Sequence, residues 1–289
     1  MPLDFLGLPP EYSRFDTSKV VILPIPYEKT TTYIKGTDKG PEAILKASYQ
    51  VELYDEELQI EPFHMGIHTS EPLCADQPEP EEMVERVRKE VVRLVQQGKY
   101  VVGLGGEHSI SIGIARAFAD VFGTFTTVQI DAHTDLREEY EGSKYNHACI
   151  MKRILEVSPG VHIGIRSMCL EEAELVKEKN IPVISAREIY SNPQWIDKAL
   201  SHIKTDRVFL TIDADGFDPS VIPGVGTPEP GGLLWYPALA FLRKLFEAKE
   251  VIGFDVTELS PIENQILSDF TCAKLVYKLI GYKYLTRHK

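Results

Sequence analysis

The chain has 289 residues, and its 43% apolar and 26% charged residues are fractions of an ordinary globular protein, which excludes wholesale disorder. Its 31 Lys and Arg against 43 Asp and Glu give a net charge of −12, which argues against nucleic acid or an anionic membrane as the main partner, because both require a basic surface. No basic start precedes an apolar run of signal length, and no window approaches about 18 apolar residues, so we expect a cytoplasmic protein without a membrane-spanning helix.

Short apolar runs alternate with amphipathic stretches along the chain. The runs predict seven strands, at Val20–Ile25, Tyr100–Leu104, Thr126–Asp131, Val161–Arg166, Ile181–Ser185, Val208–Asp213 and Val251–Val256. They are apolar at nearly every position rather than at alternate ones, which is typical of parallel strands that are covered on both faces.

The stretches between the strands predict helices. They begin near Gly40, Ser109, Ala148, Leu170, Pro193 and Tyr236, and two longer ones cover Glu81–Gln97 and Gln265–Ile280. In the first long helix we expect an apolar face of Val84, Val87, Val91, Leu94 and Val95, and in the second one of Ile266, Phe270, Ala273, Tyr277 and Ile280. The alternation predicts a single α/β domain over residues 1–289, with a parallel sheet between helices.

Acidic and imidazole side chains directly follow four of the predicted strands. Gly-Gly-Glu-His-Ser occupies residues 105–109, and Asp-Ala-His-Thr-Asp occupies residues 131–135. The sixth run ends at Asp213, which is followed by Ala214 and Asp215, and Glu258 follows the seventh run. The carboxyl ends of parallel strands meet at one edge of a sheet, where open α/β folds place their sites. These side chains are therefore expected to lie together.

The spacing of these residues favours a metal site. In an extended segment, residues two apart point the same way, which applies to Asp131, His133 and Asp135 and to Asp213 and Asp215. Two such acidic rows repel each other without a cation. Carboxylates with a few imidazoles suit manganese better than thiol-seeking zinc, and together with His108 they supply six ligands, enough for two ions with a bridging hydroxide.

Each motif also has a simpler interpretation. Any one of them alone is compatible with a turn or a helix start, with Ser109 as an N-cap residue. Asp218, before Pro219, is interpreted as a turn former. The histidines without carboxylate neighbours receive no role; they are His64, His68, His162, His202 and His288. The metal interpretation depends on three motifs at three strand ends.

These motifs, together with residues 211–232 and 36–44, resemble the ureohydrolase family of agmatinases and arginases, and agmatinases most closely. The similarity spans residues 20–265. It implies a three-layer α/β/α fold with an eight-stranded, mainly parallel sheet, shared with histone deacetylases. It also implies a centre of two Mn²⁺ ions that hydrolyses guanidino groups to urea and an amine.

The resemblance further implies individual roles. One ion would be bound by His108, Asp131, Asp135 and Asp213, and the other by Asp131, His133, Asp213 and Asp215, with Asp131 and Asp213 bridging. Asp135 would orient the attacking hydroxide, and His147 would be the acid/base residue. Glu258 would bind the guanidinium group, and Thr227 would line its pocket. The assembly would be a homo-oligomer, a trimer or a hexamer.

The chain departs from the family pattern at three places that affect substrate preference. Glu107 stands where the family usually has Asp, Thr211 where it usually has Ser, and Asp38 and Lys39 replace a common Arg. None of these changes removes a proposed ligand.

We expect agmatine as the substrate, cleaved to putrescine and urea in polyamine synthesis. Arginases bind the α-carboxylate of arginine with an Asn two residues before the acid/base His, where this chain has Tyr145. The net charge would attract a small cationic substrate. Lys144 leaves guanidinobutyrate or arginine open, and aminopropylagmatine also satisfies these residues. Formiminoglutamase activity and a non-catalytic relative are further alternatives, whereas a deacetylase would hold one zinc with fewer acidic ligands.

Overall fold

Eight strands form the central sheet of the computed structural model, which describes residues 3–286. In spatial order they are β2 (Ile67–Thr69), β1 (Val20–Ile25), β3 (Tyr100–Gly105), β8 (Glu250–Thr257), β7 (Arg207–Asp213), β4 (Thr126–Ile130), β5 (Gly160–Ile165) and β6 (Val183–Ser185). Every neighbouring pair is parallel. The seven predicted strands are confirmed. The eighth, β2, was missed because three residues at a sheet edge are too short to form a recognisable run.

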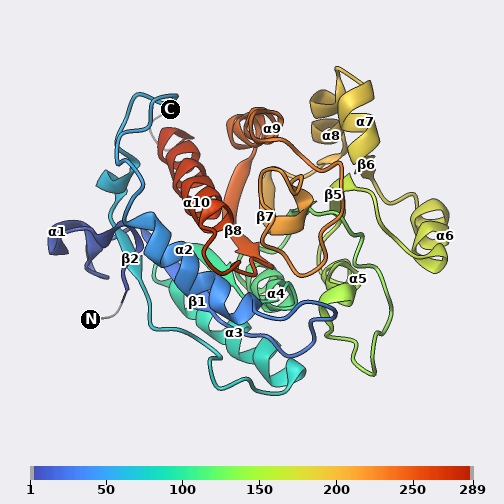
Figure 1. Cartoon of the computed structure of the whole chain (residues 1–289), viewed down its shortest axis with the longest axis horizontal. Helices are drawn as coiled ribbons and strands as arrows, with labels where there is room; N and C mark the ends of the chain where they lie inside the picture. The colour runs from blue at the N-terminus through green and yellow to red at the C-terminus, as the bar shows by residue number, and fades with distance from the viewer. Residues whose placement is uncertain (1–2, 287–289) are drawn as a thin grey trace.

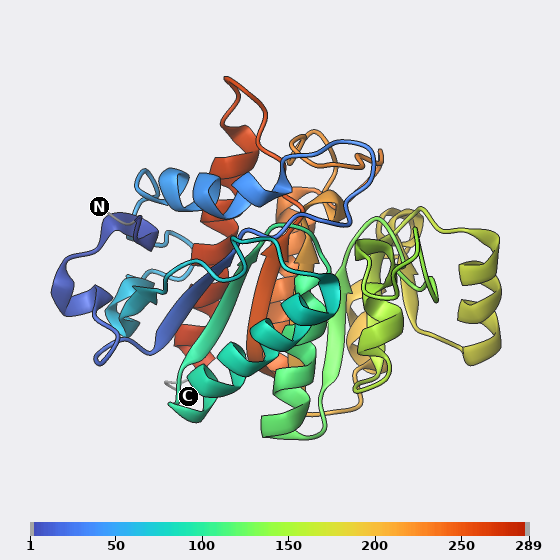
Figure 2. The same cartoon turned by 90° about the horizontal axis from the view of Figure 1, so that it is seen from below.

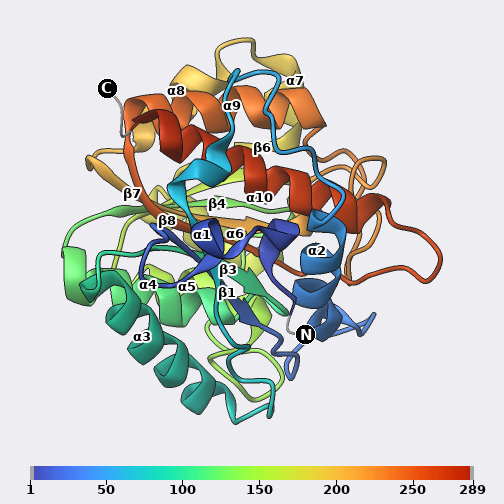
Figure 3. The ribbon, with the colours of Figure 1, turned by 90° about the vertical axis from the view of Figure 1, so that its left-hand side faces the viewer.

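Helices cover both faces of this sheet, as Figures 1 and 3 show. On one face lie α2 (Gly40–Ser48), α8 (Trp195–His202), α9 (Trp235–Ala248) and α10 (Leu267–Thr286). On the other lie α3 (Pro80–Gln96), α4 (Ile110–Phe122) and α5 (Ile150–Ile154). The helices at the two ends of the sheet are α1 (Pro10–Ser13), α6 (Leu170–Lys179) and α7 (Ala186–Ser191). The three-layer α/β/α prediction is confirmed.

Five short 3₁₀ helices complete the secondary structure of the described residues. They are η1 (Phe5–Gly7), η2 (Thr37–Lys39), η3 (Pro62–Met65), η4 (His147–Cys149) and η5 (Ala214–Gly216). No helix within residues 3–286 has both the length and the apolar composition that crossing a membrane requires.

The two helical layers explain why the strands are apolar at nearly every position. Val20 and Ile22 of β1 belong to the core that includes residues of α2, α9 and α10, whereas Val21 and Leu23 belong to the core that includes residues of α3 and α4. Successive side chains of a strand point to opposite faces, so a strand covered on both sides needs apolar residues throughout. The sheet thus separates two hydrophobic cores.

The long helices differ in how well their apolar faces were predicted. In α3, four of the five predicted residues are buried and Val95 is half-buried. The prediction for α10 is wrong at its start, because the helix begins at Leu267, and Ile266 and Phe270 are 74% and 37% exposed. Figure 2 shows the loop before α10 projecting beyond the body of the molecule. The remaining three predicted residues are buried.

The middle of α10 is buried on nearly all sides, so no single face dominates its pattern. Even a charged side chain lies inside: Lys278 is 1% exposed. Its Nζ donates to Asp55 at 2.8 Å and to Glu57 at 2.9 Å, which provides the partners that a buried charge requires.

Candidate metal centre and active-site cleft

The predicted ligands converge because they follow adjacent strands. His108 comes after β3, Glu258 after β8, Asp213 ends β7, and Asp131 follows β4. These four strands are consecutive in the sheet order. Parallel register therefore brings side chains from residues 108 to 258 to one sheet edge.

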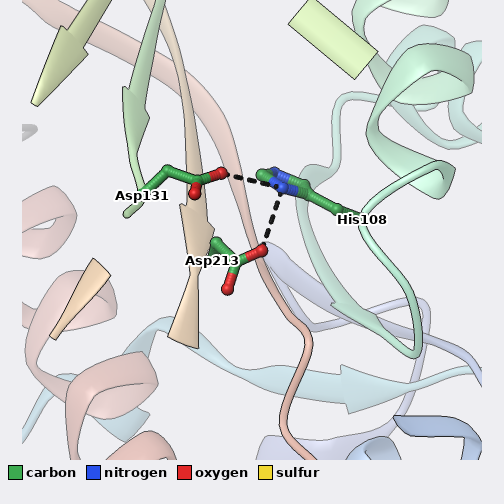
Figure 4. Close-up of side chains that lie close together, drawn as sticks. All are labelled: His108, Asp131 and Asp213. Atoms are coloured by element: carbon green, nitrogen blue, oxygen red, sulfur yellow. Dashed lines mark ion pairs between the residues drawn. The ribbon is translucent and has the colours of Figure 1, made fainter. Parts of the chain in front are cut away.

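The first group of ligand atoms surrounds the His108 ring. Its Nδ1 lies 3.2 Å from Asp131 Oδ2, 3.4 Å from Asp135 Oδ2 and 3.2 Å from Asp213 Oδ2 (Figure 4). All four residues are buried, and Nδ1 has no hydrogen-bond partner within residues 3–286. Atoms that coordinate one ion at about 2.1 Å and at right angles lie about 3 Å apart. The geometry fits one divalent cation.

The second group shares Asp131 with the first. His133 Nδ1 lies 3.0 Å from Asp215 Oδ2 and 3.6 Å from Asp131 Oδ1. These three residues also bring their ligand atoms within 4.8 Å of one another. The His133 side chain is 27% exposed, so this group faces the cleft. The structure thus brings all six predicted ligands together.

The carboxylates of this cluster lie so close together that protons or cations must neutralise part of their negative charge. Burial and the neighbouring Asp131 charge raise the pKa of Asp135 to about 7. Burial and the charges of Asp215 and Asp131 raise the pKa of Asp213 well above its usual value. Burial opposes protonation of His133, but its carboxylate partners raise its pKa to about 12. Without metal the cluster therefore retains protons, and divalent cations would take their place. An oxygen-rich donor set without thiolate suits a metal such as manganese.

Outer partners orient the His108 ring. Its Nε2 lies 2.8 Å from the Thr211 hydroxyl, which donates to Asp255 Oδ1 at 2.7 Å. Asp255 Oδ2 accepts from the Ser111 hydroxyl at 2.7 Å. With the Thr211 hydrogen directed at Asp255, Nε2 donates and Nδ1 faces the ligand cluster. Thr211 supplies the hydroxyl that the usual Ser of the family would, and such outer partners fix the ring orientation and tautomer.

A second pair of outer residues supports Asp131. Gln129 Nε2 donates to Asp131 Oδ2 at 2.7 Å, and its Oε1 accepts from Nδ1 of the buried His162. His162 was given no role from the sequence. In the structure, Gln129 is the residue that links it to the ligand Asp131. Burial lowers its pKa to about 4, so it is neutral at neutral pH. Residues such as these were missed because they are isolated polar residues inside apolar runs.

A cleft of about 250 Å³ opens onto the cluster, and its walls include most of the predicted site residues. Those that line it are His133, Asp135, His147, Asp213, Asp215, Thr227 and Glu258. The floor of the cleft consists of Asp213, which lines it, and of the buried His108 and Asp131 next to it. Wall residues that sequence reasoning missed are Thr32, Arg137, Tyr140, Ser167, Met168, Cys169 and Glu172. All but Glu172, which belongs to α6, come from loops, which have no periodic pattern.

The predicted acid/base residue lies between two polar groups. His147 Nδ1 is 3.7 Å from Glu258 Oε1, and Nε2 is 3.4 Å from the Thr32 hydroxyl. Burial lowers the pKa of His147 to about 4, below the free imidazole value expected from the sequence, so the ring is neutral at neutral pH. Glu258 Oε1 accepts from the His108 backbone N–H at 2.7 Å.

Two residues of the site have unusual backbone conformations. Asp135 and Glu258 have φ values of 51° and 61°, in the left-handed region that side chains other than glycine rarely adopt. Both lie in the cleft, where the surrounding hydrogen bonds hold them. Strain of this kind concentrates at functional sites.

Two further residues singled out in the sequence, Asp218 and Ser109, lie outside the ligand cluster. Asp218 forms a turn, since Oδ1 accepts from the Ser220 N–H and Oδ2 from the Gly231 N–H. Ser109 precedes α4 at the N-cap position, but its hydroxyl donates to Glu107 instead of capping the helix, which corrects that interpretation. His288 lies outside the described residues.

Comparison with known proteins shows, independently of the site geometry, to which family the chain belongs. The profile of the arginase family matches residues 18–281. N(1)-aminopropylagmatine ureohydrolase from a Synechocystis species is 53% identical over 93% of this chain and 90% of its own length. The protein of that name from Thermus thermophilus is 38% identical over 93% and 92%. The crystal structure of agmatine ureohydrolase of Thermoplasma volcanium superimposes with a TM-score of 0.87 at 30% identity, covering 100% of this chain and 97% of that one.

Proposed function

The chain belongs to the arginase family and is a ureohydrolase, and we propose that its substrate is N(1)-aminopropylagmatine, which it hydrolyses to urea and the corresponding triamine. The observation that carries this proposal is the 53% identity, over 93% of the chain, to a relative of that name. The six ligand-type side chains around one cleft support the hydrolytic chemistry that this proposal shares with the other candidate substrates. The cytoplasmic, polyamine-synthetic setting stays a prediction.

Agmatine is the second candidate. The similar fold of the Thermoplasma volcanium protein supports it, as does the departure of residues 141–148 from the arginase pattern. Lys144, which kept carboxylate-bearing substrates open, is outside the set of described residues that line the cleft. Arg137 does line it, so guanidinobutyrate and arginine remain useful test compounds.

We propose that the cleft binds two Mn²⁺ ions, one at each of the two ligand groups, with Asp131 and Asp213 shared. When bound, such ions lower the pKa of a coordinated water and stabilise developing negative charge. Asp135 would accept a hydrogen bond from the attacking water and orient it. Its position at the cleft surface supports this role.

The remaining side chains would act on the substrate. Glu258 would accept hydrogen bonds from the guanidinium group, as a carboxylate does in a charge-assisted pair. His147, neutral in the free protein, would accept a proton and deliver it to the departing amine. Thr227 lines the cleft and donates to Asp215 Oδ2 at 3.3 Å, so its proposed role is to support that ligand and the pocket wall.

We also propose that the protein is a homo-oligomer. Exposed apolar side chains near the start of α10 and on the N-terminal loop support it; they are Tyr33, Ile34, Ile262, Ile266, Leu267 and Phe270. Light scattering at micromolar concentration should give a multiple of 32.6 kDa. A monomer would contradict this part of the proposal.

Urea release from a substrate panel tests the proposed function. The protein, saturated with Mn²⁺, would be assayed with aminopropylagmatine, agmatine, guanidinobutyrate and arginine, and with formiminoglutamate for formamide release. We expect the highest kcat/KM for aminopropylagmatine, followed by agmatine. A higher kcat/KM for a carboxylate-bearing compound would refute the substrate assignment, and no turnover of any compound would favour a non-catalytic relative.

A further inference from the structure

One buried carboxylate fastens the N-terminal loop, residues 28–36, to the end of β3. Glu107 is fully buried, and its Oε2 accepts hydrogen bonds from the backbone N–H groups of Lys29 and Thr30, both at 2.6 Å. Its Oε1 accepts from the Thr30 hydroxyl at 2.6 Å and from the Ser109 hydroxyl. No cationic side chain within residues 3–286 forms an ion pair with this carboxylate, so the loop is its main partner.

Thr30 connects this carboxylate with the acid/base histidine. Because the Thr30 hydrogen is directed at Glu107, the lone pairs of its oxygen remain for the backbone N–H of His147, which donates to it at 2.9 Å. The Thr30 carbonyl accepts from Asn146 Nδ2 at 3.4 Å. The same loop reaches the ring through Thr32, 3.4 Å from Nε2. One loop therefore contacts both the backbone and the ring of His147.

His147 depends on these contacts because it is not on a strand end. It begins a 3₁₀ helix of only three residues, His147–Cys149. Its separation of 3.7 Å from Glu258 is too long for a hydrogen bond. Proton transfer requires heavy atoms within about 3.2 Å, and a displacement of about 1 Å can cost roughly 100-fold in rate. The loop contacts therefore fix the distance on which proton transfer depends.

We propose that Glu107, acting through the Thr30 hydroxyl, is a positioning residue for His147. Its role rests on the proposed function, because His147 must move the proton for its position to matter. Glu107 stands where the related family usually has Asp, and its longer side chain reaches the backbone of Lys29 and Thr30. The hydroxyl of Thr30 bonds both to the Glu107 carboxylate and to the His147 backbone N–H, so it is the group to change.

Three variants of Thr30 and Thr31 distinguish loss of His147 positioning from a nonspecific disruption of the loop 28–36. Thr30→Val removes the hydroxyl and keeps the shape, and Thr30→Ser restores the hydroxyl. Thr31→Val is the matched control, because the Thr31 hydroxyl contacts Glu28 and Lys35 instead. We expect Thr30→Val to lower kcat about 10- to 100-fold with KM within about threefold, and the other two to stay within about threefold of wild type.

A double variant tests whether the effect passes through His147. In a His147→Ala background, Thr30→Val should lower kcat by less than about twofold, because the residue that it positions is gone. Mn²⁺ content per chain and melting temperature would be measured for every variant, so that loss of metal or of folding is recognised. If Thr30→Val does not fold, Thr30→Ala takes its place.

Two results would overturn the role of Glu107 while leaving the proposed function intact. One is an equal loss of kcat in Thr30→Val and Thr30→Ser, which would show that the hydroxyl is not what matters. The other is a Thr30→Val effect of the same size with and without His147. A wild-type protein that releases no urea from any guanidino compound would instead overturn the proposed function, and this role with it.

Discussion

The floor of the cleft and its wall are positioned by different kinds of interaction. The floor residues His108, Asp131 and Asp213 sit at strand ends, and backbone pairing fixes their spacing, as in the register of Ile130 with Ile212. Most wall residues sit on loops that are held by side chains bonding to backbone. Glu172, for example, accepts from the backbone N–H groups of Leu136 and Cys169, both at 2.8 Å.

This difference indicates that the floor carries the chemistry and that the wall determines substrate selectivity. A floor residue cannot move without the sheet, so its replacement removes a ligand that nothing nearby can supply. A wall residue depends on a few local hydrogen bonds, so its replacement changes the shape of the cleft while the chemistry remains. Substitutions in the two regions should therefore differ in size and in the kinetic constant that they affect.

The largest effect is expected from the two shared floor carboxylates. Asp131→Ala or Asp213→Ala should lower kcat at least about 1,000-fold and reduce bound Mn²⁺ below two per chain, since each removes a ligand that we propose both ions share. Asp197→Ala, a change to an exposed aspartate, is the control. Elemental analysis and urea release provide the measurement. Full activity of wild-type protein with a single zinc per chain would contradict the two-manganese assignment.

A smaller effect is expected one layer below the floor. Asp255→Asn weakens the carboxylate that directs Thr211 toward His108, and loss of such a partner lowers metal affinity about 10- to 100-fold. Mn²⁺ titration of the metal-free protein by calorimetry measures it. Thr211→Ser should bind like wild type because it keeps the hydroxyl, whereas Thr211→Val should bind like Asp255→Asn. Unchanged affinity in both Asp255→Asn and Thr211→Val would show that these partners do not support the floor.

Acidic pH should lower the free energy of unfolding through His162, the buried residue that supports Asp131 through Gln129. Its folded pKa of about 4 is below the unfolded value of about 6.5, so the folded state binds fewer protons and stability is lost as pH falls from 6.5 toward 4. Between pH 7.5 and 5, this residue should contribute a loss of about 2 kcal/mol in the free energy of unfolding. Urea denaturation of metal-free wild type and His162→Asn would show it, with exposed His64→Asn as the control. Parallel pH profiles for wild type and His162→Asn would refute the assignment.

The smallest effect is expected in the wall. Thr227→Val removes one long hydrogen bond to Asp215, which keeps its bond from the Ala132 N–H at 3.0 Å. We expect KM to rise about threefold to tenfold with kcat nearly unchanged, the size of one ordinary hydrogen bond. Steady-state kinetics with the best substrate of the panel measures it. A loss of kcat as large as that of the floor variants would contradict the distinction between floor and wall.

The same distinction explains what the sequence could predict. The floor was predictable because each ligand follows an apolar run directly, and parallel strands bring their ends to one edge. The wall was not, because the place of Tyr140 or Met168 depends on loop contacts between distant residues. Asp255 and His162 were missed because their partners, Thr211 and Gln129, belong to other strands. The start of α10 was predicted wrongly because spacing alone cannot show that Ile266 and Phe270 are exposed.

The strand order has a consequence for synthesis on the ribosome. β8, Glu250–Thr257, is the last strand to be translated, yet it lies between β3 and β7 in the middle of the sheet. Until it emerges, both neighbours present unpaired strand edges, and such edges promote association between nascent chains. α10, which buries one face of the assembled sheet, follows later still. The strand pairing that joins the two parts of the sheet can therefore form only after Thr257 has been synthesised.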